Sequence, residues 1–492
     1  MKRSDGFAPQ VILCLLALAV ACAPPADTLL IREVLVADGT GAPLVPAAVR
    51  IDGDRIADDT HSHHAGDLPD DPAAVGAVSQ GITTIVSGPD GGSRLPLSAL
   101  FEELQATPVA VNVASFTGHG TLRRAVLGDD YRRPATEAEV DSMASLLRAD
   151  LDAGSLGLST GLEYDPGIYA TTEEIIALAR VAAGAGGRYA SHMRSEDRAL
   201  FDAVEELIRI GREAGIPVMA THLKLAMKSL WGGADELLAR LDQARAEGVD
   251  VTADVYPYEY WQSTMTVLFP DRKYTPEAAT FALEELAPPD GMIIGRYSPD
   301  TTYQGKTLAE VAGLRSEDPV TTYLALIEAV HGPEAPDDAQ ESIVARSMLA
   351  EDVATLLAWD HTNVCTDGEL HGPHPRGFGS FTRVLARHVR EEGTLSLEEA
   401  IHKMTGLSAR HVGIARRGVI EPGAYADLVL FDPTTVADRA TFEAPHEPSV
   451  GIRAVWVNGV QVWDGSAPTG ARPGRVVRRV DQAPGATAAP IS

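Results

Sequence analysis

Short apolar segments that alternate with helical patterns narrow the choice of fold for this sequence more than any other feature. From residue 82 onward they recur mostly at intervals of roughly 30 residues. Several are apolar almost throughout, which is typical of parallel strands buried on both faces. The repetition predicts an α/β chain folded as a (β/α)8 TIM-type barrel. We expect an eighth, shortened or absent, strand just before His61. The seven visible segments are Ile82–Ser87, Val109–Ser115, Ser155–Ser159, Arg188–His192, Pro217–His222, Val249–Val255 and Asn363–Thr366.

Strand-like segments without intervening helices flank this region on both sides. They are Leu29–Ala37 and Ala48–Ile56 before it, and Asp427–Phe431 and Arg453–Val457 after it. Gly and Pro turns separate them. We therefore expect residues 29–57 and 416–478 to form one small β-sandwich domain, residues 58–415 to form the barrel, and residues 479–492 to form a flexible tail.

One inter-strand segment shows the signals of a helix in detail. Ser195 is predicted to be the N-cap, with Glu196 and Asp197 favouring the positive end of the helix dipole. Apolar residues follow at helical spacing, and Gly211 and Gly215 are predicted to close the segment.

The N-terminus has the pattern of an export signal. Lys2 and Arg3 precede the eleven-residue apolar run Val11–Ala21, which is too short for a membrane-spanning helix of about 20 residues. Small residues before Cys22 are typical of a lipobox, so we interpret residues 1–21 as a lipoprotein signal peptide, Cys22 as the lipidated residue and residues 22–28 as a linker. An ordinary secretory signal cut near Ala21 or Ala23 is the alternative. The expected location is the bacterial cell envelope, facing the periplasm, with membrane contact only through the lipid.

Composition excludes several classes of protein. The formal net charge of −28 would repel phosphate backbones, which argues against nucleic-acid binding. The three cysteines are Cys14, Cys22 and Cys365, so neither a disulfide framework nor a cysteine-rich zinc site is expected.

Histidine and aspartate residues gather at the ends of the predicted strands. His61 and His63 are two residues apart, a spacing that places both imidazoles on one face of a strand. His192 and His222 end two further strands, while Asp90 and Asp367 follow two others. Catalytic groups of barrel enzymes lie at these carboxyl ends.

Imidazole and carboxylate ligands without thiolate suit Zn²⁺ or a similar divalent ion. Such an ion lowers the pKa of bound water and polarises a carbonyl oxygen, and a neighbouring carboxylate can transfer the proton. These residues therefore predict metal-assisted hydrolysis of an amide.

Several motifs resemble the amidohydrolase superfamily and, within it, the D-aminoacylase (N-acyl-D-amino-acid deacylase) family. The resemblance extends over about residues 59 to 478. It rests on Gly157-Leu158-Ser159-Thr160-Gly161-Leu162-Glu163-Tyr164, Tyr189-Ala190-Ser191-His192-Met193-Arg194, Thr221-His222-Leu223-Lys224, Asp254-Val255-Tyr256-Pro257-Tyr258, Thr366-Asp367-Gly368, His374-Pro375-Arg376 and Gly470-Ala471-Arg472-Pro473-Gly474-Arg475-Val476.

The resemblance implies a zinc-dependent enzyme that hydrolyses N-acyl-D-amino acids, or dipeptides with a C-terminal D-residue, as small-molecule substrates. It implies that His192 and His222 hold the tighter zinc, that His61 and His63 serve a weaker second site, and that Asp367 is both ligand and general acid/base. It further implies that the substrate, including its carboxylate, contacts Lys224, Tyr256, Ser263 and Arg376.

Two departures from the family pattern keep alternatives open. Gly88-Pro89-Asp90-Gly91 stands where many members have Gly-Asn-Cys-Gly, so the harder carboxylate of Asp90 replaces a thiolate. The 25–30 residues that normally precede the His-x-His pair are missing, and Arg55-Ile56-Ala57-Asp58 leads directly into Asp59-Thr60-His61. A cyclic-amide hydrolase of the dihydropyrimidinase type and a degenerate ligand-binding lipoprotein without turnover are the rival hypotheses.

Overall fold

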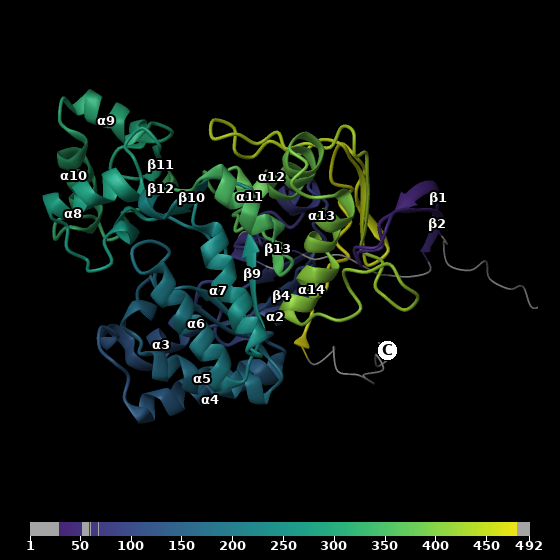
Figure 1. Cartoon of the computed structure of the whole chain (residues 1–492), viewed down its shortest axis with the longest axis horizontal. Coiled ribbons are helices and arrows are strands. Elements are labelled where there is room, and N and C mark those ends of the chain that lie inside the picture. Colours follow the sequence, from purple (N-terminus) through teal and green to yellow (C-terminus); the bar gives the residue numbers. More distant parts are fainter. Residues whose placement is uncertain (1–28, 52–58, 60, 67, 480–492) are drawn as a thin grey trace, which may run out of the picture.

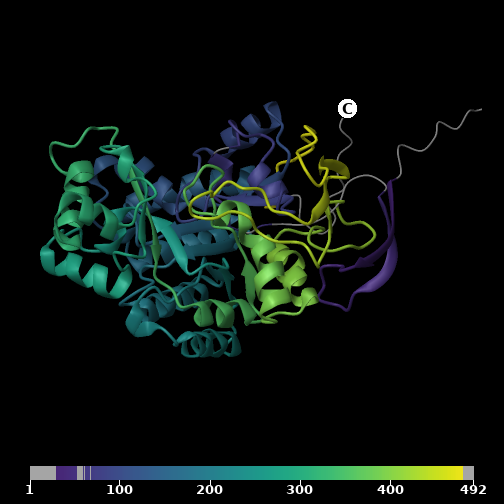
Figure 2. The ribbon, with the colours of Figure 1, turned by 90° about the horizontal axis from the view of Figure 1, so that it is seen from above.

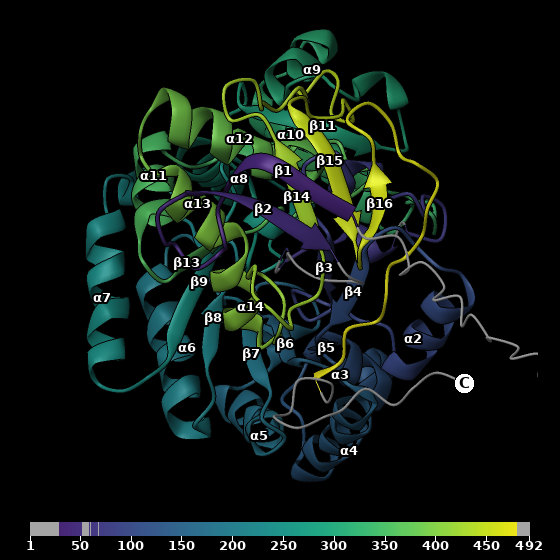
Figure 3. The ribbon, with the colours of Figure 1, turned by 90° about the vertical axis from the view of Figure 1, so that its right-hand side faces the viewer.

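Parallel strands form the centre of the molecule in this computed structural model, which describes residues 29–51, 59, 61–66 and 68–479. Six strands form one sheet in the order β13-β9-β8-β7-β6-β5, and β3 and β4 form a parallel pair. Helices α2 to α7 are arranged around the outside of these strands (Figure 3). The strands are β3 (Thr84–Ser87), β4 (Asn112–Ser115), β5 (Thr117–Gly118), β6 (Gly157–Gly161), β7 (Arg188–His192), β8 (Val218–Ala220), β9 (Val251–Val255) and β13 (Thr362–Val364).

Helix α4 begins and ends where local sequence signals place it. Thr136 and Glu139 form a capping box at the start of α4, and left-handed Gly154 ends it. The helices are α1 (Val75–Val78), α2 (Leu97–Ala106), α3 (His119–Leu127), α4 (Glu137–Ala153), α5 (Thr172–Gly184), α6 (Leu200–Ala214), α7 (Ala234–Ala246), α11 (Ala350–Ala358), α12 (Arg376–Arg383), α13 (Leu397–Met404) and α14 (Gly406–Val412). No helix among the described residues is long and apolar enough to cross a membrane.

The prediction that Ser195 caps a helix is wrong. Gly215 does end α6 as predicted, whereas Gly211 lies inside the helix. The helix begins five residues later, at Leu200, and its N-cap residue Ala199 makes no side-chain cap. The Ser195 hydroxyl instead accepts hydrogen bonds from the amides of Asp197 and Ala199. This turn keeps residues 195–199 out of the helix, because a serine side chain can satisfy local amides without one.

The segment before His61 makes a short parallel contact with β3. Asp59 pairs with Ile85, the Asp59 amide donates to the Thr84 carbonyl at 2.7 Å, and the Val86 amide donates to the Asp59 carbonyl at 3.0 Å. On its other side the His61 carbonyl accepts from the Asp367 amide at 3.1 Å. Asp59 and His61 therefore lie between β3 and the residues that follow β13.

Two small antiparallel sheets face each other beside the parallel strands (Figure 3). One is the hairpin of β1 (Leu29–Val36) and β2 (Val45–Ile51); the other contains β14 (Leu428–Phe431), β15 (Ile452–Val457) and β16 (Val460–Trp463). Ile31 and Val49 of the hairpin pack against a cluster formed by Ala426, Leu428, Ala454 and Trp456. Segments from before and after the parallel strands thus share an apolar contact.

A lobe inserted between β9 and β13 was not foreseen from the sequence. Its antiparallel strands lie in the order β10-β12-β11, and it occupies one end of the molecule while the β1–β2 hairpin lies at the other (Figures 1 and 2). Tyr323 is fully buried in it and donates to the Met265 carbonyl at 2.7 Å. The lobe contains β10 (Tyr260–Ser263), β11 (Met292–Tyr297), β12 (Glu341–Arg346), α8 (Pro276–Phe281), α9 (Leu308–Arg315) and α10 (Pro319–His331).

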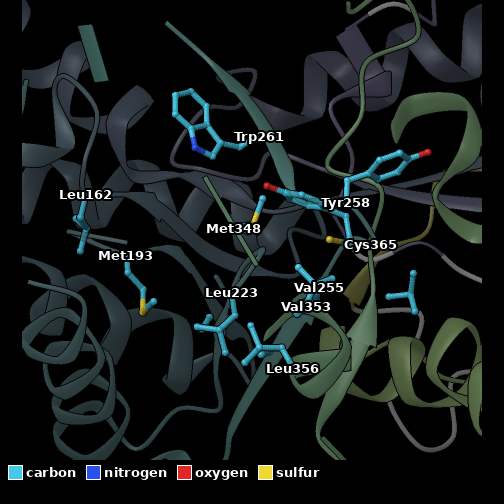
Figure 4. Close-up of a cluster of buried hydrophobic side chains, with 14 of the residues drawn as sticks. Leu162, Met193, Leu223, Val255, Tyr258, Trp261, Met348, Val353, Leu356 and Cys365 are labelled. Atoms are coloured by element: carbon cyan, nitrogen blue, oxygen red, sulfur yellow. The ribbon is translucent and has the colours of Figure 1, made fainter. Parts of the chain in front are cut away.

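Apolar side chains next to the strand ends fix the polar ones in place. Met193 and Leu223 directly follow His192 and His222, and each is only 1% exposed. Figure 4 shows them in a buried cluster that also contains Val255 and Cys365. Because close packing restricts rotamers, this cluster holds the backbone from which the two imidazoles project.

Candidate metal and substrate site

The histidines and aspartates singled out from the sequence come together at the carboxyl edge of the strands. His192 ends β7, His222 lies two residues beyond β8, and Asp90 and Asp367 each lie three residues beyond β3 and β13. They surround a cavity of about 450 Å³. Residues from distant parts of the chain meet here because parallel strands end at one edge.

His61, His63, Asp90 and Asp367 form one group of converging ligand atoms, all within 4.8 Å of one another. The Nε2 atoms of His61 and His63 lie 3.3 and 3.2 Å from Asp367 Oδ1. His61 is 1% exposed, yet neither of its ring nitrogens has a hydrogen-bond partner among the described residues. Buried nitrogens without partners are costly, so this donor set fits a cation.

His192, His222 and Asp90 form a second group. His192 Nδ1 lies 3.0 Å from His222 Nε2, which lies 3.3 Å from Asp90 Oδ1. Asp90 Oδ2 faces the first group, 3.5 Å from His63 Nε2. Asp90 therefore presents one oxygen to each group, which is the arrangement of a carboxylate that bridges two ions.

Carboxylates hold the outer nitrogens of the second pair of histidines. His192 Nε2 lies 2.9 Å from Glu163, and His222 Nδ1 lies 3.0 Å from Glu196. His192 can donate its outer N–H to Glu163 and leave Nδ1 free for a metal. At His222 the Lys224 ammonium also lies 2.7 Å from Nδ1, so Glu196 and Lys224 share the outer side of this ring while Nε2 faces the other ligands. Such outer contacts fix the tautomer and orientation of metal-binding histidines.

Negative charge dominates the electrostatics of the cluster. Burial alone would lower the pKa of His63, but hydrogen bonds and charge from Asp367 and Asp90 raise it to about 10. Burial and Lys224 likewise oppose protonation of His222, yet Glu196, Asp90 and Asp367 raise its pKa to about 10. Although burial opposes ionisation, neighbouring positive groups hold the pKa of Asp90 and of Asp367 well below the usual value. The cluster thus stabilises positive charge.

Three of the converging residues have left-handed backbone conformations. The φ angles of Asp90, His222 and Asp367 are 51°, 38° and 48°. Such conformations cost about 1–3 kcal/mol each and concentrate at functional sites. The Asp254 carboxylate accepts the backbone N–H of His222 at 2.5 Å and so supports one of them.

The four predicted substrate-binding residues line the same cavity. The guanidinium of Arg376 lies 4.7 Å and the ammonium of Lys224 lies 5.9 Å from the centre of the Tyr256 ring. Arg376 pairs with Asp367 at 2.5 Å, and Lys224 pairs with Glu196 at 2.6 Å. Ser263, on β10, faces them from the inserted lobe.

The Tyr256 hydroxyl is buried and has no hydrogen-bond partner among the described residues. Burial raises the pKa of Tyr256 well above its usual value, so the hydroxyl keeps its proton. Two cations and one free hydroxyl in one cavity can bind a carboxylate.

Sequence reasoning missed Glu163, Glu196 and Asp254 as site residues. Glu163 lies in the motif that follows β6, and Asp254 lies within β9. A polar residue at the carboxyl end of a buried strand was the available signal for both. Glu196 carried no such signal, because its pattern is that of an ordinary helix start.

Comparisons with known proteins agree with this geometry. A model of the amidohydrolase family matches residues 264–463. The chain is 36% identical to D-aminoacylase from Alcaligenes xylosoxydans xylosoxydans, over 92% of this chain and 98% of that protein. It is 39% identical to N-acyl-D-aspartate deacylase from the same organism, over 91% and 88%.

A solved structure is similar over nearly its full length. N-acyl-D-glutamate deacylase from Bordetella bronchiseptica, in complex with zinc and a phosphonate that mimics the tetrahedral intermediate, matches with a TM-score of 0.82. The identity is 34%, and the match covers 91% of this chain and 99% of that one. The chain therefore belongs to the amidohydrolase superfamily and, within it, to the D-aminoacylase, or N-acyl-D-amino-acid deacylase, family.

Proposed function

We propose that this protein hydrolyses the amide bond of N-acyl-D-amino acids in a zinc-dependent reaction. The observation that carries the proposal is the placement of two converging ligand groups and a carboxylate-binding set in one cavity. The relatives named above, which act on N-acyl-D-amino acids, support the same substrate class. Dipeptides with a C-terminal D-residue present the same amide and carboxylate.

The ligand chemistry supports zinc. His192, His222 and Asp90 would hold the tighter ion, and His61, His63 and Asp367, with the second oxygen of Asp90, would form the weaker site. When bound, zinc supplies a Lewis acid that lowers the pKa of water and polarises a carbonyl oxygen. Nitrogen and carboxylate ligands of this kind are typical of zinc hydrolases.

The side chains around the ligands suit the remaining steps of amide hydrolysis. Asp367 is ionised, so it can accept a proton from the attacking water and return it to the leaving nitrogen. Arg376, Lys224, Tyr256 and Ser263 would bind the substrate carboxylate and so fix the amide relative to Asp367. A site that matches three fixed positions (carboxylate, side chain and amide) at once discriminates between enantiomers, and the names of the relatives support the D-enantiomer as the one accepted.

The same proposal includes a closed barrel. The hydrogen bonds of Asp59 to β3 and of His61 to Asp367 support a continuous ring of eight strands, as does that of the Leu156 amide to the Ser115 carbonyl. We assign the described residues from 59 to 415 to the barrel, including the inserted lobe, and residues 29–51 and 416–478 to the small β domain. Of the predicted tail, Arg479 donates to the carbonyls of Ser155 and Leu151, and residues 480–492 lie outside the described residues.

The export signal remains a proposal, because Cys22 and the rest of residues 1–28 lie outside the described residues. We propose a lipoprotein of the cell envelope, facing the periplasm. Its test is the fractionation of cells that express the full chain: Cys22→Ala should move the protein from the membrane fraction to the soluble fraction.

A matched panel of substrates tests the enzymatic proposal. Purified protein supplied with zinc should hydrolyse N-acetyl-D-amino acids and not their L-enantiomers or carboxamides. Loss of the fixed charge contact with the carboxylate should reduce kcat/KM for the carboxamide by about 30-fold or more, since the cavity cations would be left unmatched. Preference for cyclic amides would favour the dihydropyrimidinase-like alternative, and zinc binding without turnover of any substrate would favour the ligand-binding alternative.

A further inference from the structure

A second cavity lies at the opposite end of the strands from the metal ligands. Its volume is about 250 Å³. Arg188 and Val218 are the first residues of β7 and β8, Thr252 is the second residue of β9, and His361 directly precedes β13. The candidate metal ligands follow the other ends of these strands, so this cavity is separate from the active site.

Positive charge predominates in this cavity, which we call the basic pocket. Its ionisable lining residues other than the buried Tyr189 are Arg188, Arg245, Arg410, His361, His411 and a single carboxylate, Asp250. The chain as a whole has 69 acidic and 41 basic residues. A concave patch whose sign opposes that of the protein focuses the field and attracts anions.

Two of the three arginines have no internal partner. Arg245 donates to Asp250 at 3.1 Å and to the Val251 carbonyl at 2.6 Å. Among the residues that the structure describes, the side chains of Arg188 and Arg410 make no hydrogen bond and no ion pair. In a protein with an excess of carboxylates, two cations that line one cavity without a carboxylate partner point to a ligand.

The two arginines come from different elements that meet at this pocket. Arg188 is the first residue of β7, and Arg410 lies in the last turn of α14. Gly413, which ends α14 with φ 79°, lies beside the Arg188 side chain, because a Cβ atom there would be 3.4 Å from Arg188 Nε, an ordinary contact distance. The C-terminal end of α14 therefore lies against the start of β7.

His411 adds an acceptor to these donors. Its Nδ1 lies 2.6 Å from the Asn363 side-chain oxygen, so Nδ1 carries the hydrogen and donates it. Burial and the charge of Arg410 lower the pKa of His411 to about 3, which keeps the ring neutral. Its other nitrogen, Nε2, can therefore accept a hydrogen bond.

We propose that the basic pocket binds a phosphate group, with Arg188 and Arg410 as its principal contacts. Planar guanidinium groups recognise phosphate through paired N–H donors. A singly protonated phosphate also has the O–H that a neutral His411 can accept, whereas sulfate has none. The inference does not depend on the deacylase activity, because the pocket shares no lining residue with the active-site cavity.

His361 provides a readout within the pocket. Burial and the charges of Arg245 and Lys403 lower its pKa, while Asp360 and Asp242 act in the opposite direction. Inorganic phosphate at millimolar concentration should raise the pKa of His361 by about one, relative to sodium chloride at the same ionic strength. The measurement is an NMR titration of the His361 C2–H resonance in the full folded protein, assigned with His361→Gln.

Matched variants locate the bound anion. Arg188→Gln and Arg410→Gln should each remove most of the phosphate effect, whereas Arg209→Gln, which removes an exposed arginine on α6, should retain it. Arg410 is exposed, so its variant serves if Arg188→Gln fails to fold. Both pocket variants should keep wild-type deacylation rates, because they lie at the other end of the strands.

Two results would overturn the proposal. One is a shift of the His361 pKa with phosphate that equals the shift with chloride. The other is a phosphate-induced shift that persists in both Arg188→Gln and Arg410→Gln. Sulfate as effective as phosphate would overturn the assignment of phosphate. A parallel titration with glycerol phosphate separates the two sources of the group. If glycerol phosphate shifts the His361 pKa more than inorganic phosphate does, the natural ligand is a small phosphorylated molecule. If it shifts the pKa less, the natural ligand is free phosphate.

Discussion

Two carboxylates connect metal binding with substrate binding in this site. Asp367 belongs to a ligand group and pairs with Arg376; Glu196 contacts His222 and pairs with Lys224. Each cation that would receive the substrate carboxylate is therefore held by an acid that also faces the metal ligands. Substitution of either Asp367 or Glu196 should therefore alter both metal binding and substrate binding, to different extents.

Asp367→Asn should abolish most turnover while the fold is retained. The amide has nearly the shape of the carboxylate but cannot accept the proton, and it is a weaker metal ligand. General acid–base catalysis contributes about 10²–10⁴-fold, so kcat should fall by at least that range. Steady-state kinetics and the Tm would check this prediction. A variant that kept more than about a tenth of the wild-type kcat would show that another group carries the proton.

Glu196→Gln should weaken zinc binding and raise KM together. The neutral side chain no longer favours the His222 tautomer that exposes Nε2, and it no longer fixes Lys224. Loss of such an outer contact typically lowers metal affinity by about 10–100-fold. Competition with a chromogenic chelator measures zinc affinity without any assay of activity. Glu205→Gln, an exposed acid on α6, is the control. Unchanged zinc affinity in Glu196→Gln would restrict its role to Lys224.

At the scale of elements, the barrel strands could be predicted because each has a local sequence pattern. The strands of the lobe inserted between β9 and β13 could not. Arg188–His192 is predicted with the bounds that β7 has, and the other barrel strands are offset by a few residues. A continuous apolar run identifies a buried strand wherever it lies in the chain. Strand β10, Tyr260-Trp261-Gln262-Ser263, has no such run because only Trp261 is buried.

The candidate metal ligands were predictable because they follow recognisable strands and because the carboxyl ends of strands in a barrel converge. Contacts made by loop residues could not be predicted from the sequence. The contact of Glu196 with Lys224 joins residues 28 apart in the chain, and only the turn at Ser195 brings them together. Backbone strain at Asp90 and His222 was equally hidden, because neither is a glycine or an asparagine.

The two ligand groups should differ in how firmly they hold zinc. His192 ends a strand that pairs in register along five residues with β6, whereas His61 follows a single bridge at Asp59. A displacement of about 1 Å is enough to weaken ligands that must lie near 2 Å from the ion. His192→Ala and His222→Ala should therefore remove the tightly bound zinc, and His61→Ala should leave it in place. Elemental analysis after dialysis gives the zinc content. Two equally retained zincs in the wild type would contradict this difference.

At the scale of the whole molecule, buried neutral histidines should limit stability in acid. Burial is the largest cause that lowers the pKa of His64 and His411 to about 3 and that of His388 to about 4. Each of these rings must stay uncharged in the folded protein, but ionises near pH 6.5 when the chain unfolds. The unfolded state therefore binds more protons below that pH, and the free energy of unfolding falls as the pH falls.

His388 offers the clearest test because it is remote from the ligands and only 3% exposed. Its ring nitrogens make no hydrogen bond among the described residues, although Nδ1 lies 3.3 Å from the Glu392 carboxylate. Its folded pKa of about 4 lies below the unfolded value, so its stabilising contribution is complete above pH 6.5 and is lost progressively down to about pH 4. Between pH 7 and pH 5 this loss is about 2 kcal/mol. His388→Leu fills the same apolar position without titrating and should lose that much less stability over the interval. Urea unfolding at the two pH values measures the difference, and His331→Gln, which removes a half-exposed histidine on α10, should behave like the wild type. If His388→Leu loses as much stability as the wild type, the acid sensitivity lies in the carboxylate pairs of the site rather than in the buried imidazoles.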